Sequence, residues 1–401
     1  MLSWDYPPQT TGGIAAQVAG LGAALGAAGH EVVVLTIANR RADLEAESVG
    51  NVRVRRAKID LPWLPADKPL ARTASANHAL TALGATLDSE SGGWRPDIIH
   101  GHDWSVGWAA DTLAAIHDVP LVLTMHGTER IRHGGHLPQG TPTDISSIEW
   151  WLAFRADRLI SSTRFMVEQL VTGFELTPER VERIPNGIDP ERWAGRTEGE
   201  PDRERGRHVV TWGRVQFEKG FQVLARAINQ VRASIPDVQC TIAGRGSYLP
   251  ELQTQIDVEG VSDLIDLPGY LADDALHELA RNAGCVVIPS LYEPFGIVAL
   301  EALAAGAPLI VAHTGGLAEL VDGTGAALTF EPGNSDDLGR CIDRVLRDPV
   351  LGDEMATNAR DLVHRRFAWD AIATETAAVY HSVCCLLYTS PSPRDNQPQL
   401  G

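Results

Sequence analysis

Short runs of apolar residues alternate with longer stretches of helical periodicity along most of the chain. Such runs, set between helices, are typical of buried parallel strands in βαβ units. We expect strands at His30–Ile37, Asp97–His100, Pro120–Met125, Arg158–Ser161, His208–Trp212, Val238–Ala243, Leu264–Leu267, Cys285–Pro289 and Pro308–Ala312. The pattern predicts an α/β protein with doubly wound parallel sheets.

The segment Ala194–Arg207 interrupts this alternation, because it is charged, contains glycine and proline, and has almost no apolar residues. A chain of 401 residues also exceeds the size at which one core usually keeps growing. We therefore expect two domains, residues 1–193 and 208–383, joined by a linker at 194–207. Ligands bind at the carboxyl ends of the strands in such sheets, so both domains should face a shared central cleft.

Both ends of the chain are unusual. Met1–Trp4 is very short for a first strand, which favours a natural start a few residues upstream. The segment 384–401 breaks the helical pattern and is rich in proline, serine and glutamine. It resembles translated vector or adapter sequence, and an ordinary disordered tail is the alternative. The sequence leaves open whether the final helix packs back on the first domain.

Composition narrows the functional class. The net charge of −18 argues against a general nucleic-acid-binding protein. The five cysteines lack the spacing of a metal site or a disulfide framework, which fits a reducing cytoplasm. The chain has no apolar run long enough for a transmembrane helix and no signal-peptide pattern. We expect a cytoplasmic enzyme without a transmembrane segment, and peripheral contact with a membrane stays open.

The spacing of Glu293 and Glu301 is the most informative local pattern. The first glutamate would lie on a loop, and the second about two turns into the helix that follows. Between them, Phe295, Gly296 and Ile297 offer first-turn backbone N–H groups to an anion. Such a site can bind hydroxyls at both ends and a phosphate in the middle. The alternative is a buried turn with two solvated glutamates.

Two further segments are candidates for anion binding. Gly12 and Gly13 precede an alanine-rich helix, where they either let backbone approach a phosphate or merely supply a turn with positive φ. Arg214 and Lys219 follow one strand end, where they either converge on an anion or remain two exposed basic residues. No Asp-x-Asp occurs in the chain. A diphosphate here would therefore be neutralised by cations and helix dipoles, without carboxylate-held Mg²⁺.

Histidines and glycines elsewhere are weaker signals. His126 closes the strand Pro120–Met125, where it is either structural or catalytic. Asp103 and Trp104 can contact a sugar, or form a helix N-cap with a half-buried aromatic ring. No zinc-site spacing, and hence no metal site, is predicted from His100, His102, His126, His133 and His136. A nicotinamide fingerprint is rejected because Gly20, Gly22 and Gly26 lie inside a helix.

Together these motifs resemble the family 4 retaining glycosyltransferases. The residues that carry the resemblance are Gly12-Gly13, His126, Asn186–Asp189, Gly213-Arg214, Glu218–Gly220, Glu293, Glu301 and Thr314–Gly316. The resemblance implies the GT-B fold, with two Rossmann-like domains. His100–Trp104 is similar to the HxHDW segment of glycogen and starch synthases. Ser3–Pro8 is similar to the opening of the shorter actinobacterial-type α-1,4-glucan synthases.

The resemblance also implies roles for single residues on the donor side. Arg214 and Lys219 would bind the donor diphosphate and stabilise its charge as it leaves. Glu293 would hold hydroxyls of the transferred sugar, and Glu301 would bind the nucleotide ribose. Donor binding is further implied for Gly12, Gly13, Gly296, Ile297 and Gly316.

On the acceptor side, the resemblance implies that His126 lies near the anomeric carbon and that Asp103 positions donor glucose or acceptor. The chain has no evident carboxylate nucleophile. The resemblance implies retention by a same-face substitution through an oxocarbenium-like species, in which the leaving phosphate takes the acceptor proton.

Two departures from the family pattern limit the detail. Thr10 stands where bacterial glycogen synthases usually have lysine, and Phe295 stands where they usually have cysteine. Both weaken a preference for ADP-glucose and favour a shorter-branch glucosyltransferase.

Three hypotheses follow. The first is transfer of glucose from ADP- or UDP-glucose to an oligo- or polysaccharide with α-1,4 linkages, without a further cofactor. The second keeps the chemistry but uses a lipid, small-sugar or sugar-phosphate acceptor, with mannose as an alternative donor sugar. The third is a GT-B protein that binds without transferring, against which the presence of Arg214, Lys219, Glu293 and Glu301 argues.

Overall fold

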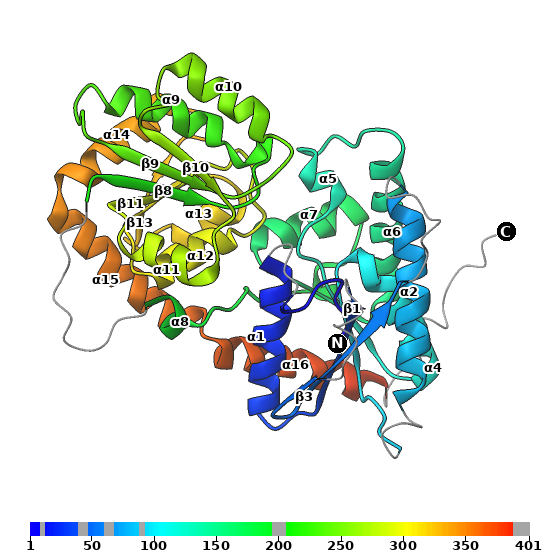
Figure 1. Ribbon diagram of the computed structural model, residues 1–401. Coiled ribbons are helices and arrows are strands. Elements are labelled where there is room, and N and C mark those ends of the chain that lie inside the picture. The colour runs from blue at the N-terminus through cyan, green and yellow to red at the C-terminus, as the bar shows by residue number, and fades with distance from the viewer. Residues whose placement is uncertain (9–12, 39–46, 60–67, 88–92, 195–205, 388–401) are drawn as a thin grey trace. The chain divides into compact units, whose positions relative to one another are not determined.

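The computed structural model describes residues 1–8, 13–38, 47–59, 68–87, 93–194 and 206–387 (Figure 1). Contacts divide the chain into two units. The first comprises Met1–Gly187 and the helix that begins at Trp369, and the second is Ile188–Ala368. The predicted linker, 194–207, lies almost wholly outside the described residues, as does the tail beyond residue 387.

The first unit contains two sets of paired strands. Its strands are β1 (Val32–Ala38), β2 (Glu47–Val49), β3 (Val52–Lys58), β4 (Ile99–His102), β5 (Leu121–Thr124), β6 (Arg158–Ser161) and β7 (Val181–Arg183). They pair in the orders β1-β3-β2 and β4-β5-β6-β7, and all pairs are parallel except β2 with β3. Leu2 joins the two sets, because it forms parallel bridges with Leu35 of β1 and Gly101 of β4.

Helices cover both faces of this sheet. They are α1 (Gly13–Ala27), α2 (Pro69–Ala85), α4 (Gly107–His117), α5 (Glu129–Arg132), α6 (Thr141–Arg155), α7 (Arg164–Phe174) and α16 (Trp369–Leu387), with 3₁₀ turns η2 (Trp104–Val106) and η3 (Pro178–Arg180). Helices α1 and α16 pack on one face through apolar residues such as Val18 and Ile372. Helices α2, α4, α6 and α7 supply the cluster on the other face. The final helix continues through Leu387, so Cys384 and Cys385 belong to it.

The second unit is a six-stranded parallel sheet in the order β10-β9-β8-β11-β12-β13. Its strands are β8 (His208–Trp212), β9 (Gln239–Ala243), β10 (Ile265–Gly269), β11 (Cys285–Ile288), β12 (Leu309–Ala312) and β13 (Ala327–Phe330). Its helices are α8 (Pro190–Ala194), α9 (Phe221–Val231), α10 (Leu249–Glu259), α11 (Asp273–Arg281), α12 (Ile297–Ala304), α13 (Gly315–Val321), α14 (Ser335–Arg347) and α15 (Pro349–Arg366), with the 3₁₀ turn η4 (Phe217–Lys219).

Alternate residues of these strands pack on opposite faces. Val209 of β8 belongs to a cluster with α9, α10 and α14, whereas Val210 belongs to a cluster with α12, α13 and α15 (Figure 1). The chain order runs outward from β8 to β10 on one side and from β11 to β13 on the other. The topological switch point therefore lies between β8 and β11, where ligands bind in open α/β sheets. The predicted doubly wound α/β fold is confirmed in both units. No helix of the described residues is long and apolar enough to cross a membrane.

Candidate active site

The loops that follow β8 and β11 meet at the switch point of the second unit. Lys219 Nζ lies 2.6 Å from Glu293 Oε2, and these side chains are only 19% and 12% exposed. The same carboxylate oxygen accepts a bond from the Ser290 hydroxyl at 3.2 Å. Adjacent parallel strands end at the same edge of a sheet, so residues 74 apart in sequence form an ion pair.

Backbone contacts hold these two loops together. The N–H of Leu291 donates to the carbonyl of Glu218 at 2.8 Å. Gly220 has φ of +70°, and a Cβ placed on it would lie 1.9 Å from the carbonyl oxygen of Pro289. Only glycine fits this close approach, and that is why Lys219 can reach the β11 loop.

Glu301 is held by a different donor from the same strand end. The indole Nε1 of Trp212 donates to Glu301 Oε2 at 2.8 Å. Burial raises the pKa of Glu301 to about 7, while this hydrogen bond lowers it. The sequence predicted Glu301 as a site residue but did not single out Trp212, because nothing near Trp212 in the chain indicates a partner 89 residues away.

The segment between the two glutamates opens α12. Gly296 occupies the N-cap position with φ of +97°, and Ile297 is the first helical residue. Gly316 packs beneath this turn, where a Cβ would lie 2.2 Å from the carbonyl oxygen of Pro294. The N–H of Gly316 donates to the carbonyl of Glu293 at 2.9 Å, so it supports the loop that carries Glu293.

Arg214 differs from these residues. It lies directly after β8, is exposed, and forms no hydrogen bond or ion pair with any residue that the structure describes. Its guanidinium group is therefore available to a ligand at the same edge of the sheet as Lys219. Gly12 lies outside the described residues, and Gly13 is the first residue of α1.

In the first unit, Asp103 and His126 come together at the ends of β4 and β5. Asp103 Oδ1 accepts a bond from the backbone N–H of His126 at 2.8 Å. Asp103 lies at the N-cap position of η2, but its side chain does not cap that turn. His126 Nε2 lies 3.2 Å from His102 Nδ1, and burial lowers the pKa of both imidazoles. Both histidines are therefore neutral near pH 7.

A buried glutamate supports the loop after His126. Both oxygens of Glu149, on α6, lie 3.0 Å from the backbone nitrogen of Glu129. Burial raises the pKa of Glu149 to about 8. Sequence analysis missed this residue, although a glutamate between the buried Ile145 and Leu152 on one helix was a usable signal.

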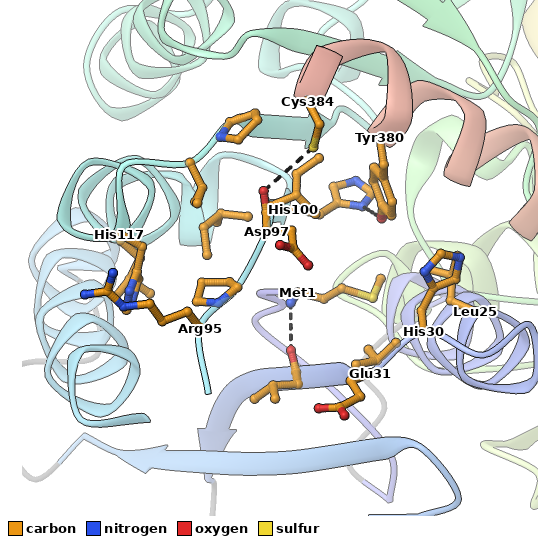
Figure 2. A pocket seen from close by; sticks show the side chains of 18 of the residues that line it. Met1, Leu25, His30, Glu31, Arg95, Asp97, His100, His117, Tyr380 and Cys384 are labelled. Atoms are coloured by element: carbon orange, nitrogen blue, oxygen red, sulfur yellow. Dashed lines mark hydrogen bonds between the residues drawn. The ribbon is translucent and has the colours of Figure 1, made fainter. Parts of the chain in front are cut away.

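The first unit also contains a cavity of about 1130 Å³, and none of the predicted site residues that the structure describes lines it. Figure 2 shows Met1, Glu31, Asp97 and His117 around it. Its walls include Val32, Ile99 and Pro120, at or near the amino ends of β1, β4 and β5. This is the edge of the sheet opposite to Asp103 and His126, whereas ligands of such folds bind at the carboxyl ends. We therefore locate the candidate site at the other edge.

A metal site is not visible in the described part of the chain, where no group of three or more histidine, cysteine, aspartate or glutamate side chains could hold an ion.

Two family models and full-length relatives of known function match this chain. Residues 11–192 match the family Glycosyltransferase Family 4, and residues 198–362 match Glycosyl transferases group 1. The chain is 34% identical to glycogen synthase of Mycobacterium tuberculosis, over 100% of this chain and 97% of that protein. It is 27% identical to α-maltose-1-phosphate synthase of the same organism, over 96% of this chain and 99% of that protein.

Solved structures share the fold. Sucrose-phosphate synthase from Thermosynechococcus elongatus superposes with a TM-score of 0.78 at 24% identity, covering 97% of this chain and 98% of that one. The catalytic domain of starch synthase IV from Arabidopsis thaliana, bound to ADP and acarbose, gives a TM-score of 0.72 at 18% identity, covering 96% and 98%. The two Rossmann-like units are therefore those of a GT-B glycosyltransferase. The chain belongs to glycosyltransferase family 4, and within it is similar to glycogen synthases.

Proposed function

We propose that the protein transfers glucose from a nucleotide-glucose donor to an α-1,4-glucan and retains the anomeric configuration. The observation that carries this proposal is the 34% identity to a glycogen synthase over the full chain. The two glutamates at the switch point support it, because Trp212 at the end of β8 already donates to Glu301 and Lys219 in the loop after β8 donates to Glu293.

The donor diphosphate binds at Arg214 and Lys219. Arg214 offers a planar fork of donors, and Lys219 retains two N–H groups beside the one directed at Glu293. The N-terminal end of α12, at Gly296 and Ile297, adds a favourable dipole. We propose that the backbone of Gly12 and Gly13 also donates hydrogen bonds to the phosphates. We propose that this charge suffices without a metal ion or other cofactor, with ADP- or UDP-glucose as donor.

The carboxylates bind the two sugars of the donor. Glu293 accepts hydrogen bonds from hydroxyls of the transferred glucose, and Glu301 accepts hydrogen bonds from hydroxyls of the ribose. We propose that His126 and Asp103 position glucose and acceptor. His126 is neutral there, because burial lowers the pKa of its ring.

The transfer itself forms one bond and breaks one bond on the same face of the sugar. The acceptor hydroxyl oxygen bonds to the anomeric carbon while the bond from that carbon to the diphosphate oxygen breaks. The leaving phosphate takes the proton of the hydroxyl. Lys219 and Arg214 stabilise the charge that develops on the diphosphate.

A second acceptor class has specific support. The similarity to α-maltose-1-phosphate synthase extends over 96% of this chain. A sugar phosphate is therefore the alternative acceptor, with the same donor-side residues.

The test is a transfer assay on the full chain. ADP-, UDP- and GDP-glucose and GDP-mannose are each supplied with maltooligosaccharides or with glucose 1-phosphate, and released nucleoside diphosphate and product are measured. We expect extension of maltooligosaccharides with a new α-linkage, detectable by NMR and unaffected by EDTA. Turnover of GDP-mannose without extension of maltooligosaccharides would overturn the proposal. If nucleotides bind but no donor is turned over, the protein binds nucleotide sugars without transferring them, and the proposal is wrong.

A further inference from the structure

Trp212 donates a hydrogen bond to Glu301 at the carboxyl end of β8. Trp212 is the last residue of β8 and is 6% exposed, and its Nε1 donates to Glu301 Oε2 at 2.8 Å. The carboxylate of Glu301 accepts no other hydrogen bond within the described chain, so Oε1 has no protein partner there. One oxygen is thus fixed by the protein, and the other is left to a ligand.

The indole is itself held firmly. Its ring stacks on Trp193 of α8, with ring centres 6.1 Å apart and planes inclined by 15°. Trp193 in turn contacts the ring of His277 at 4.2 Å. A buried indole N–H needs an acceptor, and a rigid ring can aim that N–H in one direction only. The N–H of the Trp212 indole therefore sets the orientation of the Glu301 side chain.

We infer that Trp212 is a positioning residue for the donor ribose, which holds Glu301 so that its free oxygen accepts the ribose hydroxyls. The inference rests on the proposed function, since it takes Glu301 as the ribose-binding carboxylate. It assigns the selection of ribose over deoxyribose to an indole that does not itself touch the nucleotide.

Electrostatics support this geometry. Arg192 on α8 and Asp273 on α11 are the charged groups that face Glu301, and they act on its pKa in opposite directions. They also pair with one another at 2.5 Å, which limits the net charge that they present. Helix α15 packs on α12 through apolar residues such as Ala359 and Val363. The indole is therefore the neutral group that favours the ionised carboxylate, the form that accepts two hydroxyls.

The position of Trp212 links the ribose to the diphosphate. Arg214 follows two residues later, and Gly213 between them has φ of +141° and donates its N–H to Ala243 of β9 at 2.9 Å. The end of β8, in the middle of the sheet, thus holds the carboxylate of Glu301 through Trp212 and also carries Arg214, the cation proposed to bind the diphosphate. A displacement of the indole should affect nucleotide binding and leave the acceptor side unchanged.

The test compares nucleotide binding by Trp212→Phe and Trp193→Phe with that of the wild type. Phenylalanine at position 212 keeps an apolar ring but removes the N–H, whereas the change at position 193 alters the same stack without touching the hydrogen bond.

Calorimetry with ADP and UDP, and with their 2′,3′-dideoxy analogues, gives the ribose preference as a ratio of affinities. We expect Trp212→Phe to weaken binding of the ribonucleotides about tenfold and to bring the ratio close to one. Trp193→Phe should keep the ratio.

Each outcome has a distinct meaning. An unchanged ratio in Trp212→Phe, or an equal loss in Trp193→Phe, overturns the inference and leaves the proposed function standing. If neither ADP nor UDP binds the wild type, the inference is overturned together with the donor side of the proposed function. Absence of sugar transfer despite intact ribose preference contradicts the proposed function alone.

A second measurement does not depend on the folding of Trp212→Phe. In protein labelled with ¹⁵N-tryptophan, one indole N–H signal should move with pH in the wild type as Glu301 titrates. The same signal should stay fixed in Glu301→Gln. Kinetics add a further check, because Trp212→Phe should raise KM for the nucleotide sugar, with kcat and KM for the acceptor little changed. If no indole signal follows the titration, Glu301 is not held by an indole, and the inference fails.

Discussion

Lys219 and Glu293 form an ion pair, 2.6 Å from Nζ to Oε2, across two neighbouring parallel strands. The strands end at the switch point of the sheet, and glycine at position 220 allows the loops to approach. The two groups proposed to bind diphosphate and sugar are thus already in contact before a donor arrives. Such preorganisation favours transition-state stabilisation, because little has to be reoriented during the reaction.

Glu293→Gln should separate the charge of this residue from its shape. The amide keeps an acceptor oxygen for a sugar hydroxyl but leaves the Lys219 ammonium without an ionic partner. We expect kcat/KM for transfer to fall about 100-fold, or ~2.7 kcal/mol. Unfolding in urea should show a loss of about 1–3 kcal/mol. Glu251→Gln, at an exposed position of α10, is the matched control, and it should leave transfer unchanged and alter the free energy of unfolding by less than about 0.5 kcal/mol. Near-normal transfer by Glu293→Gln would remove this residue from the site.

Arg214→Ala should affect activity without affecting stability. The guanidinium is exposed and makes no hydrogen bond or ion pair with the described residues, so its removal breaks no internal contact. We expect kcat/KM to fall about 100-fold, while the free energy of unfolding changes by less than about 0.5 kcal/mol. Arg214→Lys should recover only part of the activity, because lysine lacks the planar fork. A stability loss as large as that of Glu293→Gln would show that Arg214 has a structural role instead.

Most strands were predictable from sequence, including the edge strand β10 at Leu264–Leu267, but β3 and β13 were not. Strands β1, β5, β11 and β12 are buried along their whole length and read as continuous apolar runs. Edge strand β13 is mostly half-exposed, and β3 alternates valine with arginine, so neither produces such a run. A strand that helices cover on both faces therefore appears in the sequence as an apolar run, whereas the exposed positions of β3 and β13 interrupt such a run.

The predicted glutamates and basic residues came from local motifs, but their partners did not. Glu293 and Lys219 each lie in a recognisable segment, and the strand order then places them together. Trp212 is 89 residues from Glu301, and its contact depends on the register of β8 beside β11. Glu149 meets Glu129 through the packing of α6 against α5. Such pairings require the fold, because no spacing along one segment encodes them.

Gly220→Ala tests the close approach that brings Lys219 to Glu293. Gly260 is a suitable control, since its φ of +68° matches the +70° of Gly220 but no atom lies within 4 Å of a Cβ placed there. At Gly220, the Cβ would lie 1.9 Å from the carbonyl of Pro289. We expect Gly260→Ala to cost about 1 kcal/mol of unfolding free energy from backbone strain alone. Gly220→Ala should cost more than ~3 kcal/mol and abolish transfer. Equal costs in urea would show that the loops relax apart.

Glu149 should make stability depend on pH. Burial raises its pKa from 4.5 to about 8 in the folded protein, although the hydrogen bond from the backbone N–H of Glu129 lowers it. The charges of Asp103 and Glu129 raise the pKa further, and that of Arg132 lowers it. Below about pH 4.5 the carboxyl is protonated in both states and its burial carries no charge penalty. Between about pH 4.5 and 8 only the folded state holds the proton, so the free energy of unfolding falls as pH rises, and above about pH 8 the loss is complete.

Glu149→Gln should remove this dependence, because the amide has no proton to lose. Urea unfolding at a series of pH values should show the wild type losing on the order of 3 kcal/mol relative to the variant between pH 5 and 8. Glu168→Gln, on the exposed side of α7, should follow the wild type at every pH. Parallel curves for wild type and Glu149→Gln would mean that Glu149 is already ionised near pH 5. The Glu149 carboxylate would then be accommodated without the penalty that its burial among α5 and α6 requires.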